Sequence, residues 1–117
     1  MNNNYLEIGE RPWGKYYVLK DEPNYKLKRI EVRPRQKLSY QYHHHRQEHW
    51  IVVEGKALVI LEGEEIQLNY GESIFIPQGN KHRIMNPTDK PLVFIEVQTG
   101  TYFGEDDIIR LEDEYER

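Results

Sequence analysis

The sequence predicts an all-β fold, a sandwich or barrel, and three observations support this prediction. Short runs of β-prone residues, about nine in number, are separated by turn residues about every 8 to 12 positions. No run before residue 104 has a helical period. The length of 117 residues suits one hydrophobic core, because two cores would each bury too little apolar surface. We therefore expect a single domain over residues 1–117, with a core barrel at 15–98, an N-terminal arm at 1–14 and a C-terminal segment at 99–117.

The first strands are expected at residues 15–20, 25–32 and 38–45. Apolar and polar residues alternate with period two over 25–32, as in a strand that buries one face. Pro34 ends this run, because proline cannot donate a hydrogen bond to a neighbouring strand. The next run, 50–53, is apolar at every position and predicts a buried central strand.

Turn residues divide the second half of the chain into hairpins. Glu54-Gly55 and Glu62-Gly63 predict tight turns between strands. Pro77 with Gly79 stops one further strand, and Asn86-Pro87 stops another. The strands expected in this half are 57–61, 66–68, 73–76, 83–85 and 92–97.

The segment from residue 104 onward has a different pattern. Asp106 or Asp107 can cap a short helix there, and a frayed acidic tail is the alternative. The apolar side of that helix would carry Ile108, Ile109 and Leu111. These residues and Tyr5-Leu6 are candidate contacts of a homodimer, since a small barrel leaves apolar strand surface uncovered.

Composition argues against several functions. Lys and Arg number 16 and Asp and Glu number 20, a net charge of −4 without a dense basic run, so nucleic acid and anionic membranes are poor partners. The absence of cysteine excludes disulfides and thiol catalysis. No apolar run approaches the roughly 18 residues of a membrane span. The first 15 residues lack the features of a signal peptide, so we expect a cytoplasmic protein.

The histidines gather in one part of the sequence. All 5 lie between residues 43 and 82, and His43, His44, His45 and His49 surround Glu48. Imidazoles with a carboxylate suit one divalent transition metal, because imidazole supplies nitrogen donors and the carboxylate lowers the charge of the site. Zinc is expected first, with nickel, cobalt, manganese or iron as alternatives. A solvated cluster on a surface turn is the competing interpretation.

Two motifs resemble those of the cupin family and imply its double-stranded β-helix, a jelly-roll barrel. The second cupin motif is matched at every fixed position, by Gly71-x5-Pro77-x-Gly79-x2-His82-x3-Asn86. The first is matched in part, by His43-x-His45, Glu48 and Gly55. Arg35 replaces its usual opening glycine, and the gap from His45 to Glu48 is shorter than usual.

A narrower resemblance covers nearly the whole chain and is to the type II mannose-6-phosphate isomerase family. It implies an enzyme that interconverts mannose 6-phosphate and fructose 6-phosphate in GDP-mannose and polysaccharide synthesis. In many members this cupin follows a mannose-1-phosphate guanylyltransferase, for which 117 residues leave no room. The resemblance rests on Arg11-Pro-Trp-Gly14, on the stretch from Leu38-Ser39 to His49-Trp50, on Ile95-Glu96-Val97-Gln98, and on Gly104-Glu-Asp-Asp-Ile108 with Arg110 and Tyr115.

The expected metal ligands are His43, His45, Glu48 and His82, with His49 in reserve for Glu48. Side chains two apart on a strand point the same way, so His43 and His45 would share a face that His44 does not. Glu48 would then face away from them. A turn or bulge at Arg46-Gln47 would correct its direction, because one extra residue flips the face.

An aldose–ketose isomerase also needs a base near C1 and C2 and a cation for the phosphate. Candidate bases are His49, Glu96, and Glu48 if it is not a ligand, since the pKa of each such group can be tuned towards neutrality. Trp13 and Trp50 would line a sugar pocket or belong to the core. The candidate phosphate-binding residues are Arg46, Lys81, Arg83 and Arg110.

Two other functions compete with the isomerase. The cupin can be a non-catalytic module that binds sugar phosphate or metal and partners a separate guanylyltransferase. Two histidines and a carboxylate also form the iron site of oxygenases, although the resemblance to the mannose family and the fourth candidate ligand weigh against this reading.

Overall fold

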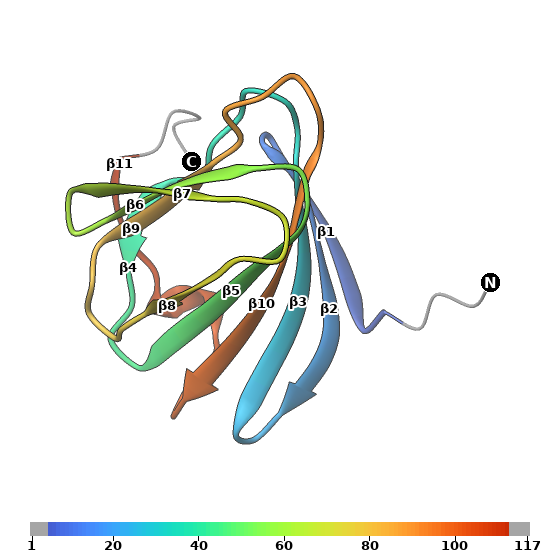
Figure 1. Cartoon of the computed structure of the whole chain (residues 1–117). Coiled ribbons are helices and arrows are strands. Elements are labelled where there is room, and N and C mark those ends of the chain that lie inside the picture. Colours follow the sequence, from blue (N-terminus) through green and yellow to red (C-terminus); the bar gives the residue numbers. More distant parts are fainter. Residues whose placement is uncertain (1–4, 113–117) are drawn as a thin grey trace.

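The computed structural model describes residues 5–112, in which eleven strands form two antiparallel sheets that enclose a barrel (Figure 1). One sheet has the order β1-β2-β3-β10-β5-β8 and the other the order β11-β4-β9-β6-β7. The all-β prediction is therefore confirmed. The elements are β1 (Glu7–Arg11), β2 (Gly14–Glu22), β3 (Tyr25–Val32), β4 (Tyr40–Tyr42), β5 (Arg46–Glu54), β6 (Ala57–Leu61), β7 (Glu64–Leu68), β8 (Ser73–Ile76), β9 (His82–Met85), β10 (Leu92–Gly100), the 3-10 helix η1 (Glu105–Asp107) and β11 (Ile109–Glu112).

Three long strands in the middle of the larger sheet carry much of the core. β10 pairs with β3 on one side and with β5 on the other, and their inward residues alternate with outward ones. Ile30, Val52 and Phe94 meet in register on the inner face, each at most 4% exposed. This apolar half of the barrel fixes the strands whose other half carries the site.

β5 differs from the expectation for residues 50–53. Trp50 and Val52 are buried, whereas Ile51 and Val53 are each 39% exposed on the outer face. The expectation of a strand buried on both faces is therefore wrong. An apolar run does not by itself show whether a second layer covers the outer face.

Both ends of the described range, residues 5–112, also form strands that the sequence pattern did not predict. Part of the N-terminal arm is β1, which pairs with β2 at the edge of the larger sheet. The expected C-terminal helix is instead η1, where Gly104 occupies the N-cap and no side chain caps it, followed by β11 alongside β4. Tyr115, part of the family resemblance, lies outside the described residues. Between residues 5 and 112, no helix is long and apolar enough to cross a membrane.

Candidate metal site

Three buried side chains meet at one end of the barrel interior. His43 follows β4, Glu48 lies on β5 and His82 begins β9, and one candidate ligand atom from each lies within 4.8 Å of the others. Each of the three residues is at most 2% exposed. The imidazole rings of His43 and His82 have their centroids 5.1 Å apart. Residues distant in the sequence therefore converge on one point, as a shared cation requires.

Main-chain carbonyls orient both imidazoles. Nδ1 of His43 donates to the carbonyl oxygen of Asp107 at 2.9 Å, and Nδ1 of His82 donates to that of Asn80 at 2.9 Å. A carbonyl only accepts, so both Nδ1 atoms carry hydrogen and both Nε2 atoms are available to a ligand. Metal-binding histidines in proteins are typically held in this way.

The atoms facing the centre of the cluster fit a cation. Nε2 of His82 is buried and has no hydrogen-bond partner in the described part of the chain. Nε2 of His43 lies 3.2 Å from Oε2 of Glu48, and these two acceptors require a proton or a metal ion between them. Two imidazole nitrogens and a carboxylate oxygen are a donor set for zinc and related divalent metals.

Gln41 lines the same cavity and was missed by the sequence reasoning. It is the Cα partner of His82 across β4 and β9, so their side chains lie on the same face of the sheet. Its amide oxygen is therefore a candidate fourth donor. Counting a gap of four residues back from Glu48 puts His43 and Gln41 at the paired positions of the first motif, and this alternative spacing was the signal that could have found it.

His45 does not join the cluster. Its side chain is 56% exposed, and Nδ1 donates to Oδ1 of Asp107 at 3.0 Å. The prediction that His43 and His45 share a face is wrong because the chain turns at these residues and is not a strand. The predicted break at Arg46-Gln47 is also absent, since β5 runs continuously from Arg46. His44 is exposed, in agreement with its placement on another face.

His49 lies on the outer face of the larger sheet. Within the regular strand β5, Glu48 and Trp50 point inward and His49 points outward. Its ring packs on Phe75 of β8, with centroids 4.6 Å apart. The structure thus separates His49 from the cluster and from the cavity, and it offers no geometric support for His49 as the base or as a reserve ligand.

The cluster borders a cavity of about 710 Å³, a volume that includes its open mouth. Its wall combines aromatic surface with charged side chains, as in sites that bind small polar ligands. Trp13, Tyr16 and Trp50 provide aromatic surface in it, so both tryptophans contribute to the core and to the pocket. The charged residues that line it are Arg11, Lys28, Arg46, Glu48, Arg83, Glu96, Glu105 and Arg110.

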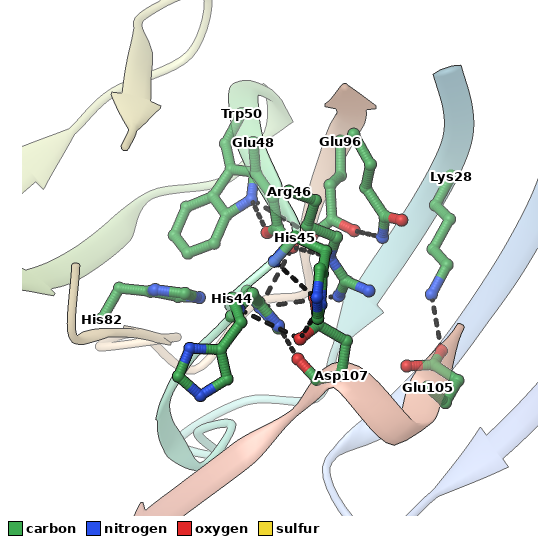
Figure 2. A network of polar contacts seen from close by, with 12 residues as sticks. Lys28, His44, His45, Arg46, Glu48, Trp50, His82, Glu96, Glu105 and Asp107 are labelled. Carbon is green, nitrogen blue, oxygen red and sulfur yellow. Dashed lines mark hydrogen bonds and ion pairs between the residues drawn. The ribbon is translucent and has the colours of Figure 1, made fainter. Parts of the chain in front are cut away.

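Hydrogen bonds surround the carboxylate of Glu48 (Figure 2). Oε2 accepts from Nε of Arg46 at 2.9 Å, and Oε1 accepts from Nε1 of Trp50 at 2.9 Å. Burial raises the pKa of the Glu48 carboxyl group, but the hydrogen bond with His43 and the charge of Arg46 outweigh it and hold that pKa well below its usual range. An anionic oxygen is therefore present for a metal ion.

Glu96 on β10 has the opposite character. Its carboxylate accepts from Nε1 of Trp50 at 3.1 Å and from Nε2 of Gln98 at 2.6 Å. Burial, followed by the negative charge of Glu48, raises the pKa of Glu96 to about 7. Two carboxyl groups that share one indole donor thus differ in their readiness to hold a proton.

The predicted phosphate-binding cations occupy different positions. Arg46 is buried against Glu48, and Arg83 donates from Nε to the carbonyl of Leu38 at 2.7 Å. Arg110 is exposed at the cavity, whereas Lys81 is exposed and does not line it. The sequence reasoning missed Lys28, a buried residue whose Nζ lies 2.8 Å from Oε1 of Glu105. Its inward place in the alternating strand β3 was an available signal.

Comparison with known proteins gives matches over nearly the whole chain. A family model described as mannose-6-phosphate isomerase C-terminal matches residues 3–113. The mannose-1-phosphate guanylyltransferase ManC of Salmonella typhimurium is 50% identical over 107 residues, which are 92% of this chain and 22% of ManC. The xanthan biosynthesis protein XanB of Xanthomonas campestris is 50% identical over 107 residues, 92% of this chain and 23% of XanB. The chain thus spans less than a quarter of the length of these curated relatives.

Solved structures resemble the chain in fold. The capsular polysaccharide assembling protein CapF from Staphylococcus aureus matches with a TM-score of 0.80 and 22% identity, over 95% of this chain and 32% of CapF. A sugar phosphate isomerase from a cupin superfamily from Silicibacter pomeroyi matches with a TM-score of 0.69 and 21% identity, over 84% of this chain and 75% of that one. These likenesses establish the cupin double-stranded β-helix.

Proposed function

The chain belongs to the family of the mannose-6-phosphate isomerase C-terminal domain, and from this premise we propose that it is a metal-dependent isomerase of mannose 6-phosphate and fructose 6-phosphate. One observation carries the proposal. Two imidazoles, tied back at Nδ1 by carbonyls, place their Nε2 atoms at the same point as the carboxylate of Glu48. That point borders a cavity whose wall carries aromatic and cationic side chains, which suit a sugar and its phosphate.

The metal would be held by His43, Glu48 and His82, with the amide oxygen of Gln41 as the fourth donor. A divalent cation, when bound, polarises the carbonyl and hydroxyl oxygens of a sugar without needing a proton of its own. The separate indole and guanidinium contacts of Glu48 support this role, since they hold its carboxylate in place and keep it charged.

Glu96 is the base that we propose for the proton transfer. The reaction moves a proton between C2 of the aldose and C1 of the ketose, so one group must both accept and return it. A carboxyl group with a pKa of about 7 can do both near neutral pH. The hydrogen bonds from Trp50 and Gln98 support this role, because they fix the carboxylate at the wall of the cavity.

Two of the arginines that line the cavity, Arg46 and Arg110, lie at different depths and suit different parts of the substrate. Nη1 of Arg46 is buried and has no hydrogen-bond partner among the described residues, so it can donate to an anionic oxygen on the reacting carbons. Arg110 is the Cα partner of Gln41 and therefore faces the same side as the cluster, at an exposed position. We assign it to the phosphate, which lies at the far end of the sugar.

The experiment that tests this function uses fructose 6-phosphate. Purified protein is stripped with a chelator, reloaded with zinc, cobalt, nickel, manganese or iron, and incubated with the sugar in D2O. Formation of mannose 6-phosphate with deuterium at C2, followed by NMR, is the expected result, because the enzyme's proton exchanges with solvent. Absence of both turnover and deuterium incorporation with every metal would reject the isomerase.

A second candidate function follows from ManC, whose name describes a mannose-1-phosphate guanylyltransferase and of which this chain spans 22%. The cupin would then bind a sugar phosphate without converting it and would partner a separate mannose-1-phosphate guanylyltransferase. Saturable binding of mannose 6-phosphate or mannose 1-phosphate by calorimetry, without deuterium incorporation, would favour this function over the isomerase.

A further inference from the structure

Asp107 contacts all three consecutive histidines, although it lies more than sixty positions further along the chain. Its main-chain carbonyl accepts from Nδ1 of His43 at 2.9 Å. Its carboxylate accepts from the backbone N–H of His44 at 3.0 Å, from the backbone N–H of His45 at 2.9 Å and from Nδ1 of His45 at 3.0 Å. One residue of η1 thus holds the whole turn that presents His43.

The carboxylate of Asp107 is almost completely buried, with its side chain 2% exposed. A buried carboxylate is unfavourable unless its oxygens accept hydrogen bonds, and here both do. These bonds also satisfy two backbone N–H groups that the turn at His44-His45 leaves without a strand partner. The contact therefore stabilises both η1 and the turn at His44-His45, and it fixes η1 against this turn.

The neighbouring groups depend on the same contact. Glu105 of η1 reaches Lys28 across the cavity wall, and the strand that follows η1 pairs with β4, which carries Gln41 (Figure 2 shows Lys28, Glu105 and Asp107). The position of η1 hence sets one wall of the cavity as well as the direction of the His43 ring.

We propose that Asp107 is a positioning residue of the metal site, and that His45 serves the site by binding Asp107 and not by ligating the metal. Asp107 acts through His43: its carboxylate anchors η1, and its carbonyl then holds Nδ1–H so that Nε2 faces Glu48. This inference rests on the metal site of the proposed function and not on the isomerase reaction.

The first test compares Asp107→Ala with Asp106→Ala. Both remove one negative charge from the same turn, but Asp106 is exposed and contacts Tyr102, so it is a matched control. Zinc and cobalt affinities are measured by competition with a chromophoric chelator. Asp107→Ala is expected to weaken binding about 10- to 100-fold, as loss of an outer-shell partner does, and Asp106→Ala to leave it unchanged. Equal affinities in both variants and wild type would overturn the proposal.

A second measurement needs no metal and remains decisive if Asp107→Ala is poorly folded. ¹H–¹⁵N NMR of the stripped protein should show a slowly exchanging hydrogen on Nδ1 of His43 in wild type and in Asp106→Ala. Asp107→Asn keeps one accepting oxygen in place of two, so it can accept from only some of the N–H groups of the turn. This variant should exchange the Nδ1 hydrogen of His43 faster. Unchanged exchange in a folded Asp107→Asn would count against the positioning role, whatever the isomerase assay gives.

The role of His45 has a test of its own. His45→Ala removes an exposed side chain, so the variant should fold, and it should still bind one equivalent of metal with an affinity reduced only several-fold. Loss of stoichiometric metal would instead make His45 a ligand and overturn this part of the proposal. His43→Ala, measured beside it, should lose the metal.

Discussion

The two ends of the barrel interior differ in the side chains that the same strands point inward. On β10 the inward residues are Leu92 and Phe94 at one end and Glu96 and Gln98 at the other. The charged end continues across the sheet, because Glu96 is the Cα partner of Lys28 and Gln98 that of Glu48. Both ends are built from the same three strands, and the apolar end differs further by a shift in the β5–β10 register between Val93 and Phe94.

This difference indicates that the apolar end stabilises the fold and that the charged end binds a ligand. Burial of large apolar side chains contributes about 1.5 to 3 kcal/mol each. Buried ion pairs gain much less, because desolvation offsets their attraction, and apolar replacements of such pairs are often neutral or stabilising by about 1 to 4 kcal/mol. A barrel of this size could be built without the charged end, so its presence indicates a function.

The largest effect should come from His82→Ala at the charged end. The variant loses an Nε2 atom that has no other partner among the described residues, and its metal content should fall to a small fraction of one equivalent. Its unfolding midpoint in the presence of chelator should stay close to that of stripped wild type. Elemental analysis and thermal unfolding check the two statements, and full retention of metal would break the assignment of the charged end.

The converse variant is Leu92→Ala at the apolar end. Leu92 is fully buried, so the change should cost about 2 to 5 kcal/mol of unfolding free energy through lost burial and a cavity. The folded fraction should still bind one equivalent of metal, since Leu92 is not among the residues that line the cavity. Denaturant titration measures the first quantity and elemental analysis the second. A stability loss smaller than about 1 kcal/mol would contradict the division into two ends.

The division of labour between the ends was only partly predictable from sequence. Alternation over residues 25–32 and turn residues such as Gly55 and Pro77 identified most strands, because those signals are local. The pairing of β1 with β2 and of β11 with β4 was not predictable, since edge strands depend on tertiary contacts. At the site, the motif spacing found His43, Glu48 and His82.

Other features of the site could not be found in this way. The direction of His45 depends on a carboxylate more than sixty positions away, and no local pattern reports such a contact. His49 was misplaced for a different reason. The assumed strand continued through His45, whereas a turn there resets the alternation, so that Glu48 points inward and His49 outward.

The variant Glu96→Gln tests the charged end through the pH dependence of the free energy of unfolding. The pKa of Glu96 is raised to about 7 in the folded protein, so between its ordinary value of 4.5 and 7 the folded state binds more protons than the unfolded state. Stability contributed by this group therefore falls as pH rises through that window, by about 3 kcal/mol in total. Glutamine does not titrate.

The free energy of unfolding of Glu96→Gln, measured in chelator, should accordingly increase relative to that of wild type from pH 5 to pH 8. The gain should level off above the raised pKa. A constant difference across this range would mean that Glu96 is ionised at all these pH values. The charged end would then destabilise the folded protein less than we propose. The same variant should be inactive as an isomerase, since an amide cannot accept the proton.

The smallest effect is expected from Arg110→Ala at the mouth of the charged end. Arg110 lies far enough out to be exposed, so its loss should raise KM for fructose 6-phosphate several-fold while kcat changes little. Lys81→Ala removes the same charge from an exposed residue outside the cavity and should change neither. Equal increases of KM in both variants would mean that the general field of the surface attracts the phosphate. An increase confined to Arg110→Ala requires a direct contact, and it would extend the functional end of the barrel from the buried cluster to β11.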